Sequence, residues 1–275
     1  MHTVDAHGAS IPAIGLGTWT LKGREAQAMT ETAIETGYRH IDTARMYANE
    51  ESVGAGIAAA GLARDELFVT TKVWHSDLRA ADLRRSLDAS LSDLGLDQVD
   101  LFLIHWPNAD IPLSETIEAM NTARAEGLTR HIGVSNFPSA LLKQAVGLSE
   151  APLVANQVEN HPYLDQRKVH AACREYGIAM VSYCPLFRGG PIFSERPVAD
   201  AARRTGKTPG QVVLRWHVQQ EGVVAIPRTT KPERLKENID LFDFELTGDE
   251  MEAISALRGR GKRVCDFDFS PEWDS

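Results

Sequence analysis

The amino-acid sequence predicts an α/β fold, a single (β/α)8 barrel of the TIM type with a short N-terminal β-hairpin. Short runs rich in Val, Ile and Phe alternate along the chain with stretches of helical periodicity. Asp42, Lys72, His105 and Ser135 end or follow such runs and are spaced by 30, 33 and 30 residues, the length of one βαβ unit. We expect one domain over residues 1–275, since the alternative, a doubly wound open sheet, usually has about five or six strands.

The hairpin comes first, with Val4 and Ile11–Ile14 expected as strands on either side of the turn region Asp5–Ser10. Several later runs are apolar on both faces, which is typical of parallel strands covered by helices. The eight predicted barrel strands are Gly15–Trp19, Arg39–Thr43, Leu67–Val73, Val99–Trp106, His131–Ser135, Val154–Val158, Met180–Tyr183 and Val223–Ile226.

The clearest predicted helix is Asp82–Leu94, in which leucines recur at helical spacing. Ser76 and Asp77 are expected to cap its start, and Gly95 to end it. The segment Gly54–Ala59 matches the G-x-G-x-x-A dinucleotide-binding pattern, but it follows a polar helix start rather than a strand. We therefore interpret its glycines as helix-packing residues.

Composition and charge exclude several classes of protein. The chain is 43% hydrophobic and 24% charged, which is ordinary for a globular protein. Its net charge of −9 repels phosphate backbones and anionic lipids, so we expect no nucleic-acid or membrane partner. Three widely spaced cysteines fit a reducing compartment, and the sequence shows neither a secretory signal nor an apolar run of about 18 residues. These features predict a cytoplasmic protein, which we expect to be a monomer without a metal site.

Charged side chains follow apolar strands at the end where barrel enzymes carry their active sites. Burying such a charge without a partner costs roughly several kcal/mol. Taken singly, Asp42 fits a helix cap, Lys72 a surface side chain and His105 a core imidazole. Their coincidence at one end of the predicted barrel instead indicates a catalytic site.

Seven motifs between Gly37 and Leu246 resemble, in order, those of the aldo-keto reductases, and among bacterial members those of the 2,5-diketo-D-gluconate reductases. The resemblance runs from about Gly15 to Leu246. This resemblance implies a (β/α)8 barrel and an NADPH-dependent oxidoreductase that reduces carbonyl groups to alcohols. The motifs are GYRHIDTARMYANE (Gly37–Glu50), TKVW (Thr71–Trp74), DLFLIHWP (Asp100–Pro107), GVSNF (Gly133–Phe137), NQVENHPYL (Asn156–Leu164), SYCPL (Ser182–Leu186) and IPRTTKPERLKENIDLFDFEL (Ile226–Leu246).

The resemblance implies a catalytic tetrad of Asp42, Tyr47, Lys72 and His105. Carbonyl reduction needs a hydride at carbon and a proton at oxygen, and tyrosine, with an ordinary pKa of about 10, is a poor acid. An adjacent Lys72 ammonium favours the phenolate and so makes Tyr47 a better proton donor, while Asp42 keeps Lys72 charged and oriented. A neutral His105 can donate a hydrogen bond to the carbonyl oxygen.

The resemblance also implies contacts to the nicotinamide end of the cofactor. Ser135, Asn136 and Gln157 carry neutral polar groups that suit a carboxamide, and Tyr183 offers a flat face for stacking. The alternatives are turn chemistry before Pro138 for the first two and a core aromatic for Tyr183.

A basic cluster directly after the last predicted strand is implied to bind the 2′-phosphate of NADPH. Many members of the family have Lys-Ser where this chain has Arg228-Thr229, but charge and hydroxyl are retained, so NADPH is still expected. The cluster is Arg228, Thr229, Lys231 and Arg234, and the residues implied near the adenine are Glu237 and Asn238.

Three tryptophans, Trp19, Trp74 and Trp106, are expected to line the open end of the barrel, with rim packing as the alternative. The pocket suits small carbonyls: keto sugar acids such as 2,5-diketo-D-gluconate, methylglyoxal or simple aldehydes. Arg188 and Arg263 are candidates to meet a substrate carboxylate. The short variable segments expected to complete the pocket are Asn108–Leu113, Phe187–Pro197 and the C-terminal segment Gly259–Ser275.

Two other functions stay open on the sequence. An NADPH-binding regulatory member of the same family would have little turnover, and the complete tetrad argues against it. A barrel hydrolase or isomerase would use Asp42 and His105 as acid and base, but it would leave Ser135, Gln157 and Arg228 without a purpose.

Overall fold

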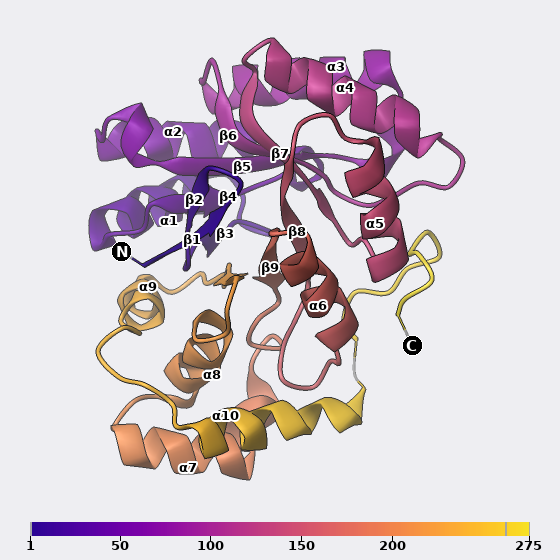
Figure 1. Cartoon of the computed structure of the whole chain (residues 1–275). Helices are drawn as coiled ribbons and strands as arrows, with labels where there is room; N and C mark the ends of the chain where they lie inside the picture. Colours follow the sequence, from indigo (N-terminus) through magenta and orange to yellow (C-terminus); the bar gives the residue numbers. More distant parts are fainter. Residues whose placement is uncertain (1, 262, 275) are drawn as a thin grey trace.

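Eight parallel strands form the centre of the structure. The computed structural model describes residues 2–261 and 263–274, so Met1, Lys262 and Ser275 of the predicted domain lie outside the described residues. Within the described part, each barrel strand pairs with the next one along the chain (Figure 1). The strands are β3 (Leu16–Gly17), β4 (His40–Asp42), β5 (Phe68–Val73), β6 (Val99–Ile104), β7 (Thr129–Ser135), β8 (Leu153–Glu159), β9 (Ala179–Tyr183) and β10 (Val223–Ala225).

The sheet closes on itself between its first and last strands. The Gly15 amide donates to the Ala225 carbonyl at 3.0 Å, and the Ala225 amide donates to the Ala13 carbonyl at 2.9 Å. A Cβ atom at Gly17 would come within 2.7 Å of the Ile226 carbonyl oxygen, so this seam requires glycine. The predicted (β/α)8 barrel is confirmed.

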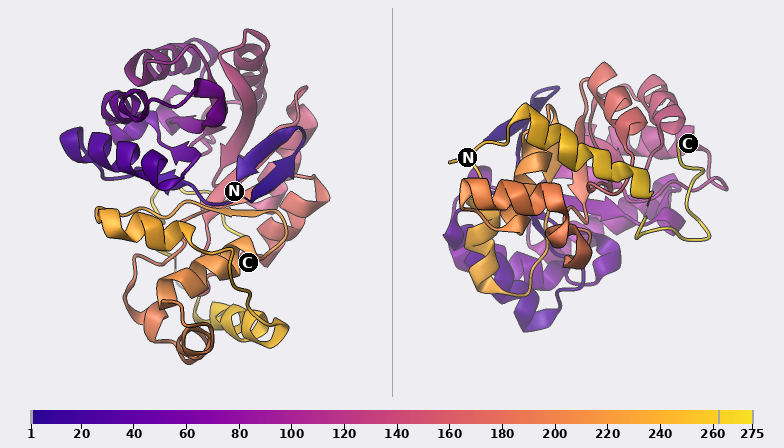
Figure 2. Two further views of the ribbon diagram at one scale, coloured as in Figure 1. Left: turned by 90° about the vertical axis from the view of Figure 1, so that its left-hand side faces the viewer. Right: turned by 90° about the horizontal axis from the view of Figure 1, so that it is seen from below.

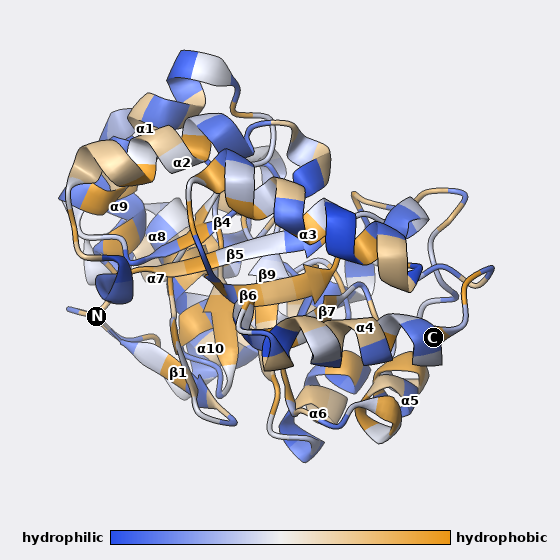
Figure 3. Ribbon diagram, turned by 90° about the horizontal axis from the view of Figure 1, so that it is seen from above, coloured by the Kyte–Doolittle hydropathy of each residue, from blue (hydrophilic) through white to orange (hydrophobic). Residues whose placement is uncertain are grey.

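Apolar residues on both faces explain why these runs form buried strands. Every residue of β5 and β6 is buried, as parallel strands between a barrel interior and a layer of helices must be. Figure 3 shows β6 as largely hydrophobic and β5 as less so, beside helices that carry many hydrophilic residues. All eight predicted runs overlap the observed strands, although β3 is shorter than the predicted Gly15–Trp19.

The predicted N-terminal hairpin is present. Strand β1 (Thr3–Ala6) pairs antiparallel with β2 (Ala9–Pro12), and the turn between them is His7-Gly8, with positive φ at both residues. The turn is therefore tighter than the predicted region Asp5–Ser10. Ala6, Ala9 and Ile11 are buried in one apolar cluster with barrel residues, so the hairpin packs against the barrel.

Helices connect the strands, and the predicted helix Asp82–Leu94 is α3 (Ala80–Leu94), which ends at Gly95 in the left-handed conformation. The expectation that Ser76 and Asp77 cap it is wrong: both lie in a separate 3-10 turn, and the Ala80 amide instead donates to Glu115 Oε1 at 3.1 Å. The other helices are α1 (Gly23–Thr36), α2 (Glu50–Ala60), α4 (Leu113–Ala125), α5 (Ser139–Leu148), α6 (Arg167–Glu175), α7 (Arg196–Thr205), α8 (Pro209–Val218), α9 (Pro232–Ile239) and α10 (Gly248–Ser255).

The two glycines of the G-x-G-x-x-A segment lie inside α2, where neighbouring helices approach closely. A Cβ atom at Gly54 would collide with the backbone of Leu94 on α3. At Gly56 it would come within 2.6 Å of the Gln27 carbonyl oxygen on α1. Their interpretation as helix-packing residues is confirmed.

The C-terminal tail, residues 263–274, returns to the barrel after α10, which itself packs against α7 (Figure 2). The tail ends beside the start of α5 (Figure 1), where the Ser139 amide and hydroxyl donate to Asp274 at 2.8 and 2.7 Å. Among the described residues, we find no helix with the length and apolar character needed to cross a membrane.

Candidate active site

Asp42 and Lys72 form a buried ion pair at the carboxyl ends of adjacent strands. Asp42 is the last residue of β4, and Lys72 stands near the end of β5. Lys72 Nζ donates to Asp42 Oδ1 at 2.6 Å and to the Thr43 carbonyl at 2.7 Å. The Lys72 side chain is 0% exposed, so its charge depends on these partners rather than on water.

Tyr47 reaches this pair from the 3-10 turn that follows β4. Its hydroxyl oxygen lies 3.4 Å from Lys72 Nζ. The backbone carbonyl of Tyr47 accepts a hydrogen bond from Lys22, and its ring lies 5.7 Å from that of Trp19. Contacts on both sides therefore hold the phenol over the ammonium group.

Burial dominates the protonation of both groups. It lowers the pKa of Lys72, an effect that the Asp42 carboxylate opposes. It raises the pKa of Tyr47 well above 10, and the Asp42 charge adds to this rise. Tyr47 therefore keeps its proton at neutral pH, and the expected effect of Lys72 on the phenolate stays a prediction.

His105 directly follows β6 and faces the Tyr47 ring, at 5.5 Å between centroids. Burial, followed by the Lys72 charge, holds the pKa of His105 well below 6.5. Its Nδ1 atom is buried and has no hydrogen-bond partner among the described residues. The imidazole is therefore neutral. With its proton on Nε2, the buried Nδ1 atom carries no hydrogen, so no N–H group is left without an acceptor there.

The four residues expected around the nicotinamide form one network with this cluster. Asn136 donates to the His105 carbonyl at 2.9 Å and accepts from the Tyr183 hydroxyl at 2.8 Å. It also donates to Ser135 Oγ at 3.0 Å. Gln157 Nε2 donates to Asp42 Oδ2 at 2.7 Å, so the tetrad and this polar set share a carboxylate.

Comparison with known proteins identifies the family. The model of the aldo/keto reductase family matches residues 13–258. The chain belongs to the aldo/keto reductase family. It is therefore an oxidoreductase.

Individual aldo-keto reductases are similar over nearly the whole chain. Methylglyoxal reductase DkgB of Escherichia coli O157:H7 is 42% identical over 268 residues, 96% of this chain and 100% of that protein. An aldo-keto reductase of Mycolicibacterium vanbaalenii is 44% identical over 249 residues, 90% of this chain and 88% of that protein. The crystal structure of a proposed 2,5-diketo-D-gluconic acid reductase B superposes with a TM-score of 0.97 and 43% identity, covering 100% of this chain and 98% of that one.

The basic cluster expected at the 2′-phosphate lies at the start of α9. Arg228, Lys231 and Arg234 are exposed, and none has an ion-pair partner among the described residues. Thr229 Oγ1 accepts from the Lys231 amide at 3.0 Å. Three unpaired cations beside a helix start fit an anionic group well. Of the residues implied near the adenine, Asn238 is buried and Glu237 accepts a hydrogen bond from Thr208.

The C-terminal tail supplies aromatic residues that sequence reasoning missed. Trp19 is 39% exposed, whereas Trp106 is only 4% exposed because the tail covers it. Trp74 is half-buried, and its ring also meets the tail. The sequence feature that could have indicated this contact is the presence of aromatic residues in an otherwise polar C-terminal segment. The tail rings that contact Trp74 or Trp106 are Phe267, Phe269 and Trp273.

Glu159, at the end of β8, ties the tail to the barrel and was also missed. Its Oε1 accepts from the Val264 amide at 2.6 Å, and its Oε2 accepts from the Cys265 amide at 2.7 Å. His161 Nε2 lies 2.9 Å from Glu159 Oε1, so the imidazole is a further partner of this carboxylate. No set of three or more metal-binding side chains occurs among the described residues.

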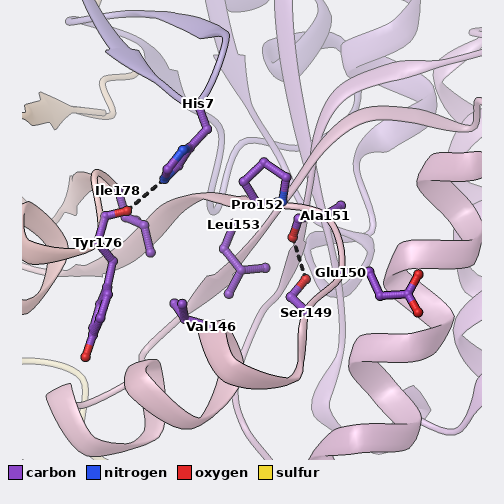
Figure 4. A pocket seen from close by; sticks show the side chains of 9 residues that line it. All are labelled: His7, Val146, Ser149, Glu150, Ala151, Pro152, Leu153, Tyr176 and Ile178. Carbon is purple, nitrogen blue, oxygen red and sulfur yellow. Dashed lines mark hydrogen bonds between the residues drawn. The ribbon is translucent and has the colours of Figure 1, made fainter.

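A separate cavity of about 270 Å³ lies at the opposite, amino-terminal end of the strands (Figure 4). Leu153, the first residue of β8, lines it, together with Ile178 just before β9. His7 lies across it, with Nε2 2.7 Å from the Tyr176 carbonyl. None of the tetrad residues lines this cavity, so it is distinct from the candidate active site.

Proposed function

We propose that this aldo-keto reductase reduces small aldehydes and ketones to alcohols, with NADPH as the reductant and Tyr47 as the proton donor. One observation carries the proposal. The Tyr47 hydroxyl lies 3.4 Å from Lys72 Nζ, which is itself 2.6 Å from Asp42 Oδ1, and the neutral His105 ring faces the phenol. An acid, a cation to stabilise its conjugate base and a neutral hydrogen-bond donor therefore converge at one end of the barrel.

Each member of the tetrad has a separate task in this proposal. Tyr47 holds its proton until negative charge develops on the substrate oxygen, and then transfers it there. The phenolate that remains lies beside the Lys72 ammonium, which stabilises it in a site of low dielectric constant. Asp42 keeps Lys72 protonated despite burial. His105, neutral at physiological pH, orients the carbonyl by donating from Nε2.

The polar network and the basic cluster would hold the cofactor. Ser135, Asn136 and Gln157 offer neutral groups for the carboxamide, and Tyr183 offers a ring face. The unpaired cations at the start of α9, including Arg234, suit a phosphate monoester, which favours NADPH over NADH. When bound, NADPH supplies the hydride.

Small carbonyl compounds are the proposed substrates. Of the similar proteins, DkgB is named for methylglyoxal and the proposed reductase B for 2,5-diketo-D-gluconic acid, both compact carbonyl compounds. The tail packs aromatic rings against Trp106 and Trp74, which supports a compact pocket. The assembled tetrad argues against a regulatory member with little turnover.

We further infer that the described chain acts as one domain, since its helices and its tail pack on or beside one barrel. The acidic net charge of −9 and the unpaired cysteines support a monomer in a reducing, cytoplasmic setting. Light scattering at several protein concentrations tests the monomer directly.

Tyr47→Phe tests the proposed function. NADPH oxidation is followed with methylglyoxal, glyceraldehyde and 2,5-diketogluconate. Loss of the general acid is expected to lower kcat by about 10²- to 10⁴-fold, while NADPH binding is unchanged. Tyr176→Phe is the matched control, since Tyr176 lies at the opposite end of the barrel. Equal rates for Tyr47→Phe and the parent would remove Tyr47 from the chemistry.

Arg234→Ala tests the cofactor assignment. A charge-assisted contact to the 2′-phosphate is worth about 1.5–3 kcal/mol, so the Kd for NADPH is expected to rise about 10- to 100-fold. The Kd for NADH, which lacks this phosphate, is expected to stay within about twofold. Arg196→Ala, on the highly exposed face of α7, is the control. Similar losses for both cofactors contradict the assignment.

A further inference from the structure

Glu50, the first residue of α2, carries a buried carboxylate that the proposed mechanism does not use. Its side chain is 1% exposed. Thr71 Oγ1 donates to Glu50 Oε1 at 2.5 Å, and Ser90 Oγ donates to Oε2 at 3.0 Å. Arg45 Nη1 donates to Oε2, also at 3.0 Å. A carboxyl group that accepts from three donors, one of them a guanidinium, carries a negative charge, and burying such a charge is costly.

The partner Arg45 begins the 3-10 turn that ends at Tyr47, and it also pairs with Asp93 on α3. The Ala48 amide donates to the Arg45 carbonyl at 3.1 Å and closes this turn. Ala48 has a φ of 48°, a left-handed conformation that a residue other than glycine keeps only where the surrounding structure enforces it. The ion pair between Arg45 and Glu50 joins the two ends of this segment, so it fixes the backbone that carries the Tyr47 phenol.

On its other side, Glu50 is bonded to β5, the strand that carries Lys72. Thr71 directly precedes Lys72, and the side chains of successive strand residues point to opposite faces. Lys72 therefore faces the barrel interior with Asp42, while Thr71 faces the helices and bonds to Glu50. One carboxylate thus holds both segments that supply the phenol and the ammonium, and the Tyr47 hydroxyl oxygen lies 3.4 Å from Lys72 Nζ.

The Glu50 charge also acts on Lys72 through the interior of the protein. Burial lowers the pKa of Lys72, the Asp42 carboxylate opposes this effect, and the Glu50 carboxylate adds to that opposition. Both carboxylates therefore help to keep Lys72 protonated. The other titratable groups around Lys72 are Tyr47, His40 and His105, and burial is the main cause that lowers the pKa of both histidines.

We propose that Glu50 is a positioning residue for carbonyl reduction: it fixes the turn of Tyr47 against β5, and its charge helps to hold the Lys72 ammonium. This inference rests on the proposed carbonyl reductase function. Glu50 acts through Arg45, through Thr71 and through the field of its charge. Its loss should therefore slow the chemical step more than it weakens the binding of substrate or cofactor.

The test compares Glu50→Gln with Glu51→Gln, the same change at the next position of α2, where the side chain is exposed. Methylglyoxal reduction with NADPH is measured from about pH 6 to 10. Glu50→Gln loses a charge-assisted hydrogen bond, so kcat is expected to fall at least about 10-fold, with the KM for methylglyoxal and the Kd for NADPH within about threefold. Glu51→Gln is expected to match the parent.

The pH profile distinguishes positioning of the tetrad from general support of the fold. Without the Glu50 charge, Lys72 loses its proton more easily, so the alkaline fall of kcat is expected at lower pH in Glu50→Gln than in the parent. Arg45→Lys keeps the charge beside Glu50 but not the planar fork that anchors the turn. It is expected to lower kcat about three- to tenfold and to leave the alkaline fall at the pH of the parent.

Three results would overturn the inference. A kcat equal to that of the parent in Glu50→Gln would remove Glu50 from the reaction, and a lowered kcat with an unchanged pH profile would mean that it only supports the fold. Should Glu50→Gln fail to fold, a kcat equal to that of the parent in Arg45→Lys would show that the turn needs no such anchor. If the parent reduces no carbonyl at all, the proposed function itself fails, which is a different outcome from reduction that is insensitive to Glu50→Gln.

Discussion

Two buried carboxylates stand at the carboxyl ends of opposite barrel strands, and they do different work. Asp42 ends β4 and Glu159 ends β8, four strands apart in a closed ring of eight. Both are fully or almost fully buried. Asp42 is balanced by a cation, the Lys72 ammonium, and by the Gln157 amide. Glu159 is balanced by backbone amides of the tail and by His161.

The difference shows how the partner determines the role of a buried charge. The ammonium partner links Asp42 to the Tyr47 hydroxyl, which lies 3.4 Å from Lys72 Nζ. Glu159 instead accepts hydrogen bonds from backbone amides, and so it fixes the segment of the C-terminal tail to which those amides belong. Burial alone would raise the pKa of Glu159, but hydrogen bonds from His161 and the tail amides outweigh it and lower that pKa. In the proposed mechanism Asp42 therefore orients Lys72, whereas Glu159 holds the C-terminal tail against the barrel.

Lys72→Met gives the largest effect expected from this comparison. It leaves the Asp42 charge buried without its cation, and breaking a buried pair in this way costs about 3–5 kcal/mol. Denaturant unfolding measures the loss, and carbonyl reduction is expected to be undetectable. The double variant Lys72→Met with Asp42→Asn should regain most of the stability and none of the activity. A double variant as unstable as the single one would mean that the pair is not the source of the loss.

Glu159→Gln gives a smaller effect of another kind. The amide keeps the shape but not the charge that accepts the tail amides, so the free energy of unfolding should fall by about 1–3 kcal/mol. Hydrogen exchange at Val264 and Cys265 should become faster, while kcat for a saturating neutral aldehyde should fall far less than in Lys72→Met. Glu150→Gln, an exposed carboxylate, controls for the charge change. Unchanged exchange at both amides would refute the role of Glu159 as a tether.

The smallest expected effect is on the pH dependence of kcat. Because burial and the Lys72 charge hold the pKa of His105 well below 6.5, its neutral form persists as pH falls from 8 to 6, and kcat should stay constant over that range. A kinetic pKa near 6.5 that disappears in His105→Gln would contradict this. Stability should respond differently. The unfolded chain takes up a proton on this histidine below about pH 6.5 and the folded one does not, so the free energy of unfolding falls as pH decreases.

Much of the fold and of the candidate site was predictable from the sequence, because strands and helices are indicated by the pattern of residues within each short segment. Alternating apolar runs predicted all eight strands, and spacings near 30 residues placed Asp42, Lys72 and His105 at the same barrel end. The structure brings these residues and Tyr47 together. The prediction that Ser76 and Asp77 cap α3 was wrong, because the residue that accepts from the Ala80 amide, Glu115, belongs to another helix. No local sequence pattern indicates a partner so far along the chain.

What the sequence by itself determined is the order of the strands and the chemical groups at their ends, since periodicity and residue type act over one βαβ unit. Only the tertiary structure decided which groups touch across the barrel: Gln157 meets Asp42 from 115 residues away, and Glu159 meets Val264 from 105. It also decided the direction in which the pKa values of Tyr47 and His105 shift, because burial and charges from distant segments cause those shifts. Contact and desolvation depend on the closed barrel, and neither exists in the unfolded chain.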